Sequence, residues 1–293
     1  MKRHRSIALV ALVACATAMA GAASASATGP TGDYAVFDQC PRYSARVNLC
    51  LFAHTSTGRV TLGDQSVPIT KPIVLQRGII RNEGTEAETF VAALNGETLT
   101  KSPQNVPRGL LDLLECDEIT EPLERILCEV AFENGMTAVN ATTELAEPAS
   151  AIKVSKNNLV NREGVALSLP VKIHLENPLL GSECYIGSSS RPLVWNLTTG
   201  TTSPPAPNGS ISGKVGKIDE KDDAEFIQIS DDTLVDNAFA SPGVTGCGGA
   251  LAFVLDPIIN AKLGLPAPAG HGTVILNNLI DLAAAESVIA SEK

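Results

Sequence analysis

A strict alternation of apolar and polar residues between residues 165 and 176 constrains the fold more than any other stretch. The apolar side of VALSLPVKIHLE carries Val165, Leu167, Leu169, Val171, Ile173 and Leu175. Successive side chains of a β-strand point to opposite faces of a sheet, so this spacing predicts a long strand with one buried face. Pro170 cannot donate a hydrogen bond to a neighbouring strand, and it therefore predicts a sheet edge or a bulge.

Shorter strand candidates fill most of the remaining chain. They lie at 34–40, 48–55, 60–63, 66–76, 137–146, 151–161, 183–188, 192–200, 211–219, 225–239 and 250–256. Turn-forming residues separate many of them, which is typical of antiparallel sheets. The fold class predicted is mainly β, an antiparallel sandwich or an irregular barrel. Aromatic residues make up only 4% of the chain, so its core must consist mostly of Val, Ile, Leu and Ala.

Helical spacing interrupts the β pattern at about residues 107–135. Apolar residues recur there every three to four positions, and Thr120 followed by Pro122 is a good start for a second helix. This pattern predicts an inserted helical hairpin. One or two helical turns are also expected at 257–266, and a surface helix is expected in the tail at 277–293. Residues 28–293 are expected to form a single exported domain, with a two-part split near 138–150 as the alternative.

The first 27 residues have the pattern of a secretory signal peptide. Three basic residues precede an apolar stretch, and Ala25-Ser26-Ala27 fits the small-x-small cleavage rule, which would make Thr28 the first mature residue. A bacterial lipobox ending at Cys15 is the alternative, in which a lipidated Cys15 would anchor the protein to a membrane. Both readings predict export. No later segment approaches the roughly 18 apolar residues that a membrane span requires.

The charge balance disfavours polyanionic partners. Cleavage after Ala27 removes three basic residues and no acidic ones, which leaves 19 basic and 32 acidic residues and a net charge of −13. Such a surface repels nucleic-acid backbones and anionic lipid headgroups, so no nucleic-acid partner is expected. The acidity is more simply a means of keeping a secreted protein soluble.

Six cysteines remain after cleavage, and an even number in an exported chain indicates disulfides. They are Cys40, Cys50, Cys116, Cys128, Cys184 and Cys247. Fifteen pairings are possible, and the sequence does not fix the connectivity. The simplest arrangement joins successive cysteines, with two short loops and one long one. Cys247 lies in the glycine-rich stretch GVTGCGGAL. We favour the interpretation that Cys247 is half of a disulfide over the interpretation that it is a nucleophile presented on a tight turn.

The sequence contains no familiar catalytic or metal-binding motif. The mature histidines, His54, His174 and His271, have no zinc-site spacing, and no cofactor is expected. No G-x-S-x-G occurs, although the serines of GSECYIGSSS leave open a hydrolase with an unrecognised constellation.

A cluster of acidic residues lies between residues 219 and 232. Its members are Asp219, Glu220, Asp222, Asp223, Glu225, Asp231 and Asp232. Their oxygens could bind calcium, but they lack the order of an EF-hand loop. A solvated hairpin tip is the simpler interpretation.

Several phrases resemble a set of uncharacterised secreted proteins of high-GC Gram-positive bacteria. They include FDQCPRY, NLCLF, VPITKPIVLQRGIIRNE, NREGVALSLPVKIHLENPLLGSECYIGSSSRP, DNAFASPGVTGCGG and INAKLGLPAPAG, and together they span most of the chain. The resemblance implies export, and it carries over no activity or catalytic residue.

The sequence therefore favours an exported, non-enzymatic binding or structural protein of the cell envelope or the extracellular space. Its expected partner is an extracellular ligand or envelope component of unknown identity. A secreted hydrolase and a lipid-anchored envelope protein are the alternatives.

Overall fold

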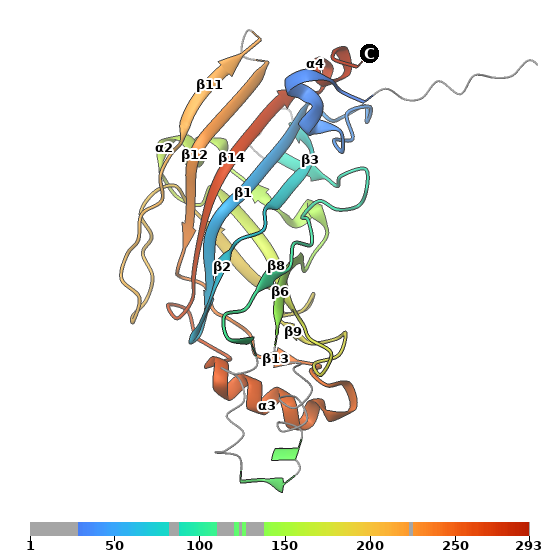
Figure 1. The fold of residues 1–293 in the computed structure, drawn as a ribbon. Coiled ribbons are helices and arrows are strands. Elements are labelled where there is room, and N and C mark those ends of the chain that lie inside the picture. Colours follow the sequence, from blue (N-terminus) through green and yellow to red (C-terminus); the bar gives the residue numbers. More distant parts are fainter. Residues whose placement is uncertain are drawn as a thin grey trace, which may run out of the picture.

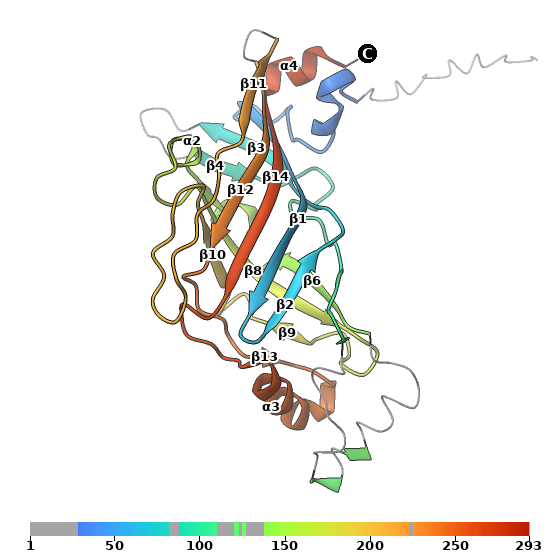
Figure 2. The same ribbon diagram turned by 60° about the vertical axis from the view of Figure 1, so that its left-hand side comes forward.

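Two antiparallel sheets of seven strands each form the architecture (Figure 1). The computed structural model describes residues 29–81, 88–109, 120–122, 125–126, 138–222 and 225–292. In Figure 2, strands of the second sheet pass behind those of the first, and apolar side chains from both sheets pack between them. The chain is therefore mainly β, as predicted, but it forms two sheets and no closed barrel within the described residues.

The first sheet has a central pair of strands from the two ends of the chain. Its order is β11 (Lys217–Lys221), β12 (Phe226–Asp236), β14 (Thr273–Ala284), β1 (Leu49–Leu62), β3 (Ile73–Arg81) and β4 (Glu88–Val91), and β2 (Gln65–Ile69) also pairs with β1. β1 and β14 pair from Leu49 opposite Ala284 to Thr61 opposite Thr273, with a register shift between Thr55 and Thr57. This pairing ties the start of the described chain to its end.

The second sheet is built around the alternating strand. Its order is β13 (Val244–Thr245), β9 (Tyr185–Ile186), β8 (Leu167–Glu176), β6 (Asn140–Leu145) and β5 (Gln104–Asn105), while β10 (Leu193–Leu197) and β7 (Lys153–Val154) also pair with β8. The apolar residues of β8 are buried at every second position from Leu167 to Leu175, which confirms the predicted strand. Val165 precedes the strand and is exposed.

Pro170 lies within the central strand of the second sheet and not at the edge of that sheet, but the side of β8 that its nitrogen faces is locally unpaired. Its carbonyl accepts a hydrogen bond from the backbone of Ala146. The missing N–H therefore faces the same side, where β6 ends at Leu145 and β7 has not yet begun. Because no strand needs a donor at that point, the proline costs the sheet little.

The described helices are short and lie at the ends and edges of the sheets. They are the 3-10 helices η1 (Gly32–Phe37), η4 (Ala149–Ala151) and η5 (Gly249–Leu251), and the α-helices α2 (Lys156–Asn161), α3 (Ala252–Leu263) and α4 (Ala285–Ala290). Four segments differ from prediction: 34–40 contains η1, 151–161 contains α2 and only two residues of strand, 250–256 belongs to η5 and α3, and the tail at 277–293 is divided between β14 and α4. The expected helical hairpin at 107–135 lies almost entirely outside the described residues.

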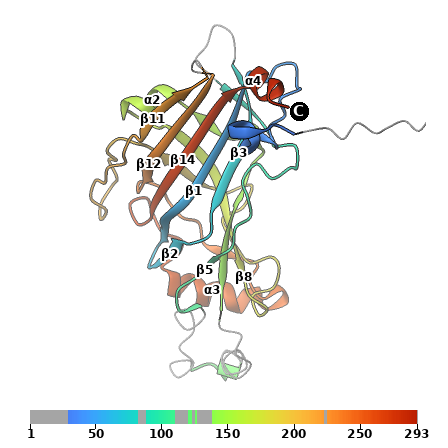
Figure 3. The same ribbon diagram turned by 45° about the horizontal axis from the view of Figure 1, so that its top comes forward.

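Two apolar clusters stabilise the fold. The larger one lies between the sheets and contains residues from before and after the interval 138–150. The smaller one covers the outer face of the first sheet, where Phe37 of η1 and Val288 of α4 pack with Phe226. In Figure 3, η1 (blue) and α4 (red) lie together over one end of that sheet. Both faces of β14 are buried at this end, which explains why its sequence does not alternate there.

Disulfides join Cys40 to Cys50 and Cys184 to Cys247. These are two of the three expected pairs, and Cys116 and Cys128 lie outside the described residues. The second bond explains the glycines beside it.

The turn around Cys247 leaves no room for larger residues. A Cβ atom at Gly246 would lie 2.2 Å from the carbonyl oxygen of Glu183, and φ is +81° there. Asp256 of α3 accepts hydrogen bonds from the backbone of Gly246 and Cys247, at 2.9 and 2.8 Å. Cys247 is therefore a crosslink held in a tight turn, as favoured from the sequence.

Candidate functional site

An apolar cavity of about 70 Å³, measured as space for the centre of a water-sized sphere, lies between the two sheets. Strands β1, β3 and β14 of the first sheet face β8 and β10 of the second across it. Typical wall residues are Leu51, Leu75, Ile280, Leu282, Leu169 and Trp195. The residues that line it are mostly aliphatic because the inner positions of these strands form the core of the molecule.

A second cavity of about 60 Å³ adjoins the first on the side of α3. Val60, Ile73 and Thr143 line both cavities, so the two are neighbours, and we call them together the interior space. Along β1 the lining runs from Leu51 in the first cavity to Leu62 in the second. Those eleven steps correspond to about 35 Å of strand. The lining residues therefore extend along most of β1.

Arg77 lies on the wall of the first cavity, at a position where the strand pattern calls for an apolar residue. It follows Leu75 and precedes Ile79 on the inner face of β3, and all three line the cavity. Only 1% of Arg77 is exposed, and none of its three guanidinium nitrogens has a hydrogen-bond partner among the residues that the structure describes. The ring of Phe90 lies 3.2 Å from its Cζ atom.

A cation held in this way is under electrostatic strain. Burial lowers the pKa of the Arg77 guanidinium well below its ordinary range, and the negative charge of Glu88 opposes that shift. Buried charges are normally paired, so an arginine without hydrogen-bond partners marks a place where an anion would be stabilised.

An ion pair lies at the rim of the first cavity. Glu88, at the start of β4, accepts from the ammonium group of Lys156 at 2.6 Å, and the two side chains are 6% and 36% exposed. Lys156 begins α2, which follows the capping residue Ser155. The pair therefore connects the edge of the first sheet to the second half of the molecule, and it extends from the cavity to the surface.

The charges that line the first cavity do not cancel. Its only ionisable lining residues, within the described chain, are Arg77, Lys156 and Glu88. Their ordinary charges give a net charge of +1. The described residues that line the second cavity include no ionisable side chain.

A row of polar side chains crosses the first sheet further along the cavity. The hydroxyl of Thr55 donates to Asn278 at 2.6 Å, and the amide nitrogen of Asn278 donates to Asp232 at 3.2 Å. Asp232 is fully buried, and one of its carboxylate oxygens has no hydrogen-bond partner among the described residues. Burial raises the pKa of Asp232 to about 6, although hydrogen bonds from Asn278 and Gly216 lower it.

Trp195 gives this site an internal reporter. It is the single tryptophan of the chain, it lies on β10, and it lines the first cavity with 2% of its surface exposed. Its indole nitrogen has no hydrogen-bond partner in the described part of the structure. A molecule that enters the cavity must therefore change the surroundings of the only tryptophan.

His54, His174 and His271 line neither cavity. His54 stacks on Phe52, and His271 is exposed. His174 stacks on Tyr185 with a centroid distance of 4.5 Å, and its Nδ1 atom lies 3.7 Å from Glu176. Ser188 and Ser190 hydrogen-bond to each other at 3.1 Å. Across the described ranges no histidine hydrogen-bonds a serine, so this geometry offers no serine–histidine relay.

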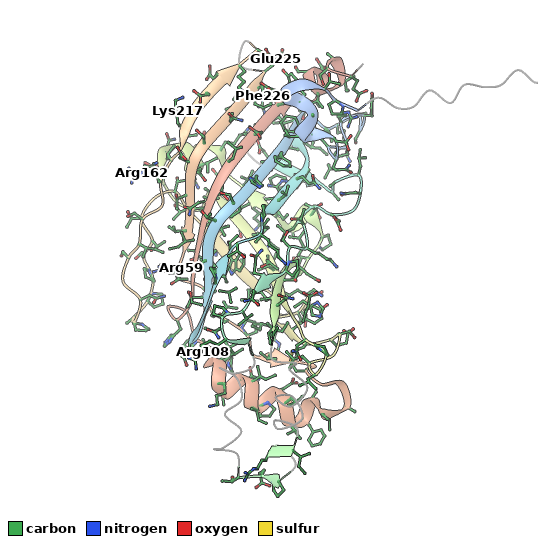
Figure 4. The ribbon with its side chains drawn as sticks, in the orientation of Figure 1. Arg59, Arg108, Arg162, Lys217, Glu225 and Phe226 are labelled. Carbon is green, nitrogen blue, oxygen red and sulfur yellow. A yellow bond between two sulfur atoms is a disulfide. The ribbon has the colours of Figure 1, made fainter. Side chains whose placement is uncertain are left out.

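The acidic residues at 219–232 do not converge on one point. They lie on and around the hairpin of β11 and β12, where Figure 4 labels Lys217, Glu225 and Phe226. Asp219 pairs with Lys217 at 2.9 Å, Asp222 accepts from Tyr34 at 2.9 Å, and Glu225 accepts from Ser287. Asp223 is outside the described residues. No three acidic, histidine or cysteine side chains of the described chain are grouped as metal ligands would be.

Sequence reasoning did not find Arg77. The signal was present, because Arg77 occupies an apolar position of an alternating strand between Leu75 and Ile79. It could be interpreted only once β3 had been placed inside the first sheet, with one face toward the second sheet.

No family model, curated protein or solved structure matches the chain significantly. Within the described residues, no helix has both the length and the apolar character needed to span a membrane. Inference about function therefore rests on the geometry of the cavities.

Proposed function

We propose that the protein is an exported binding protein, active in the cell envelope or outside the cell, that holds an elongated apolar ligand between its two sheets. Two adjoining apolar cavities in the middle of the core carry this proposal. Ligand sites are typically concave, mostly apolar and provided with a few placed polar groups. Arg77, Trp195 and Asn278 are such groups here.

The shape of the interior space indicates the shape of the ligand. The cavity volumes are small because they count only positions of a sphere's centre, and the walls lie about 1.4 Å further out. When these volumes are spread over about 35 Å of strand, they describe a narrow tube. A single alkyl chain fits such a tube, whereas a fused-ring or branched molecule would have to separate the sheets.

Export is supported by the basic-apolar-small pattern of the first 27 residues and by the disulfides, which form in oxidising compartments. The intact mass of protein recovered from the producing cell tests this step. A mass that corresponds to a chain beginning at Thr28 agrees with secretion. A mass that corresponds to a chain beginning at a lipid-modified Cys15 indicates anchoring, and the mass of the uncleaved chain contradicts export.

Blocking the cavity tests the binding function. Ala53 lines the first cavity on β1. Ala53→Phe fills this space, and Ala53→Leu does so with less risk to the fold. Val194 on β10 is 38% exposed and faces away from the cavity, so Val194→Phe is the matched control.

The measurement is the titration of delipidated protein with a neutral dye that consists of one unbranched chain, the conjugated polyene alcohol octadeca-9,11,13,15-tetraen-1-ol. Wild type and Val194→Phe should bind the dye, and both Ala53 variants should bind it at least tenfold more weakly. Circular dichroism and thermal unfolding identify any variant that fails to fold. If wild type binds no dye, or if a folded Ala53 variant binds it as well as the control does, the cavity is not a binding site.

A further inference from the structure

We propose that the ligand is a single-chain amphiphile with a carboxylate head group, bound with that carboxylate on Arg77 and with its alkyl chain running toward the second cavity. This inference rests on the proposed binding function and adds the chemical class and the orientation of the ligand. Its first support is the state of the guanidinium group. A side chain that is 1% exposed, lines the cavity and has no hydrogen-bond partner among the described residues is a ready anion receptor.

The packing of Phe90 leaves the donors of Arg77 available. The ring centroid of Phe90 lies 3.2 Å from the Cζ atom of Arg77, so the ring covers a face of the guanidinium. The N–H bonds of a guanidinium lie in its plane and point outward from its edge. Stacking on one face therefore fixes the plane of the guanidinium without occupying any of its N–H donors. Two of these donors then remain aligned to bind the two oxygens of a carboxylate.

The charge of the site fits one negative charge. The residues that line the first cavity carry a net charge of +1 when Glu88 is ionised and paired with Lys156 at 2.6 Å. A monoanion would neutralise the site. A phosphate monoester, with nearly two negative charges at neutral pH, would leave an excess negative charge beside Glu88.

A carboxylate is favoured over other monoanions because it is planar. Two parallel hydrogen bonds from arginine to carboxylate add both strength and direction. A phosphodiester has the same charge and a tetrahedral head, so the test includes it as a competing chemistry.

The second cavity sets the direction of the chain. The described residues that line it include no ionisable side chain, whereas Arg77 lies on the wall of the first cavity. A charged head placed in the second cavity would remain unpaired, at a cost of several kcal/mol. An alkyl chain can occupy that space, passing Leu75 and Ile73 along β3, both of which line the first cavity.

The test compares dodecanoate with dodecanol, which has the same chain and no charge. Quenching of Trp195 fluorescence by bromine-labelled forms of each compound reports their entry into the cavity. Wild type should bind dodecanoate at least about tenfold more tightly than dodecanol, as expected for a charge-assisted pair of hydrogen bonds. Arg77→Met should remove this preference, so that it binds dodecanoate no more tightly than dodecanol. Arg77→Lys should retain part of the preference, because lysine keeps the positive charge but cannot donate two parallel hydrogen bonds to the carboxylate.

Arg59→Met is the matched control. Arg59 is exposed on β1, and Figure 4 shows it on the lower half of that strand. This variant should keep the full preference for dodecanoate.

The remaining outcomes contradict either the carboxylate inference alone or both this inference and the binding function. Equal binding of dodecanoate and dodecanol by wild type overturns the carboxylate inference and leaves the binding function in place. Tighter binding of dodecyl methyl phosphate than of dodecanoate overturns it in favour of a phosphodiester. Absence of Trp195 quenching by every probe overturns both proposals.

Discussion

Replacing Arg77 by methionine should stabilise the ligand-free protein, although such a change removes a large buried side chain. Methionine is unbranched and flexible, and it can pack against Leu75 and Ile79 in the space that the arginine stem occupies. Glu88 keeps its ion pair with Lys156 in this variant, while its second carboxylate oxygen has no hydrogen-bond partner among the described residues, as in wild type. What the variant removes is a buried charge without hydrogen bonds to the described residues.

The size of the gain follows from two opposing effects. Replacing buried charges by packed apolar residues is neutral or stabilising by about 1–4 kcal/mol. Against this, stacking on Phe90 and the attraction of Glu88 are lost, and a desolvated cation–π contact contributes about 2 kcal/mol. Subtracting this loss from the gain leaves a net stabilisation of at most about 2 kcal/mol. For a chain of this size the melting temperature should rise by up to about 8 °C.

Scanning calorimetry of delipidated protein measures this shift, with Arg59→Met as the control that should change stability by less than about 0.5 kcal/mol. Adding dodecanoate should reverse the order of stability. Ligand at about a hundred times its Kd stabilises a protein by about 2.7 kcal/mol, and only wild type should bind the carboxylate tightly enough to gain this. If Arg77→Met melts well below wild type without ligand while Arg59→Met does not, Arg77 is a structural residue and the reasoning from its unpaired charge is wrong.

Three further changes test neighbouring features. Glu88→Gln removes the negative charge that competes for Arg77, so dodecanoate should bind several-fold more tightly in the same fluorescence assay; unchanged or weaker binding would contradict the charge count. The pKa of Asp232 is raised by burial from 3.8 to about 6, so the folded state favours its protonated form and its contribution to stability falls as pH rises through that interval. Urea unfolding should find Asp232→Asn close to wild type near pH 4 and about 3 kcal/mol more stable above pH 7; a difference that does not depend on pH would refute this. Replacing both Cys184 and Cys247 by serine should lower the free energy of unfolding by about 4 kcal/mol, because this disulfide closes a loop of 63 residues in the unfolded chain. Removing Cys40–Cys50, which closes a loop of only 10 residues, should lower it by about 3 kcal/mol. Equal losses from the two would argue against the chain-entropy explanation.

The parts of the fold that could be predicted are those set by local pattern. β8 was predictable because one of its faces is buried over its whole length, which produces strict alternation. The segment 250–256 was expected to be a strand because a short apolar run does not distinguish a strand from a helix. In the structure it begins α3, which ends at Gly264 in a left-handed conformation.

The prediction of a helix in the tail at 277–293 was wrong in part, for a different reason. A surface helix was expected over 277–293, but residues up to Ala284 belong to β14, and the helix α4 covers only Ala285–Ala290. There η1 and α4 cover the outer face of the first sheet, so both faces of the strand are apolar and alternation is lost. Packing between distant segments decided the conformation, and no local pattern could show it.

The cavity site depends even more on distant contacts. Arg77, Glu88, Lys156 and Trp195 lie on four separate elements, β3, β4, α2 and β10. Their convergence follows from the facing of two sheets whose strands are not adjacent in the chain. The two described disulfides, by contrast, could be predicted from the sequence, because an even number of cysteines behind a signal-peptide pattern indicates disulfides.

The disulfides also explain how such an interior can persist. An unfilled space between the sheets and a buried Arg77 each lower the stability that core packing alone can supply. A crosslink stabilises mainly by restricting the unfolded chain, and this effect does not require a filled core. Cys184–Cys247 holds the turn before α3, at the end of the molecule beside the second cavity, and Cys40–Cys50 lies in the smaller cluster on the outer face of the first sheet. The two described crosslinks are thus placed outside the walls of the first cavity, and replacing residues of those walls would not disturb them.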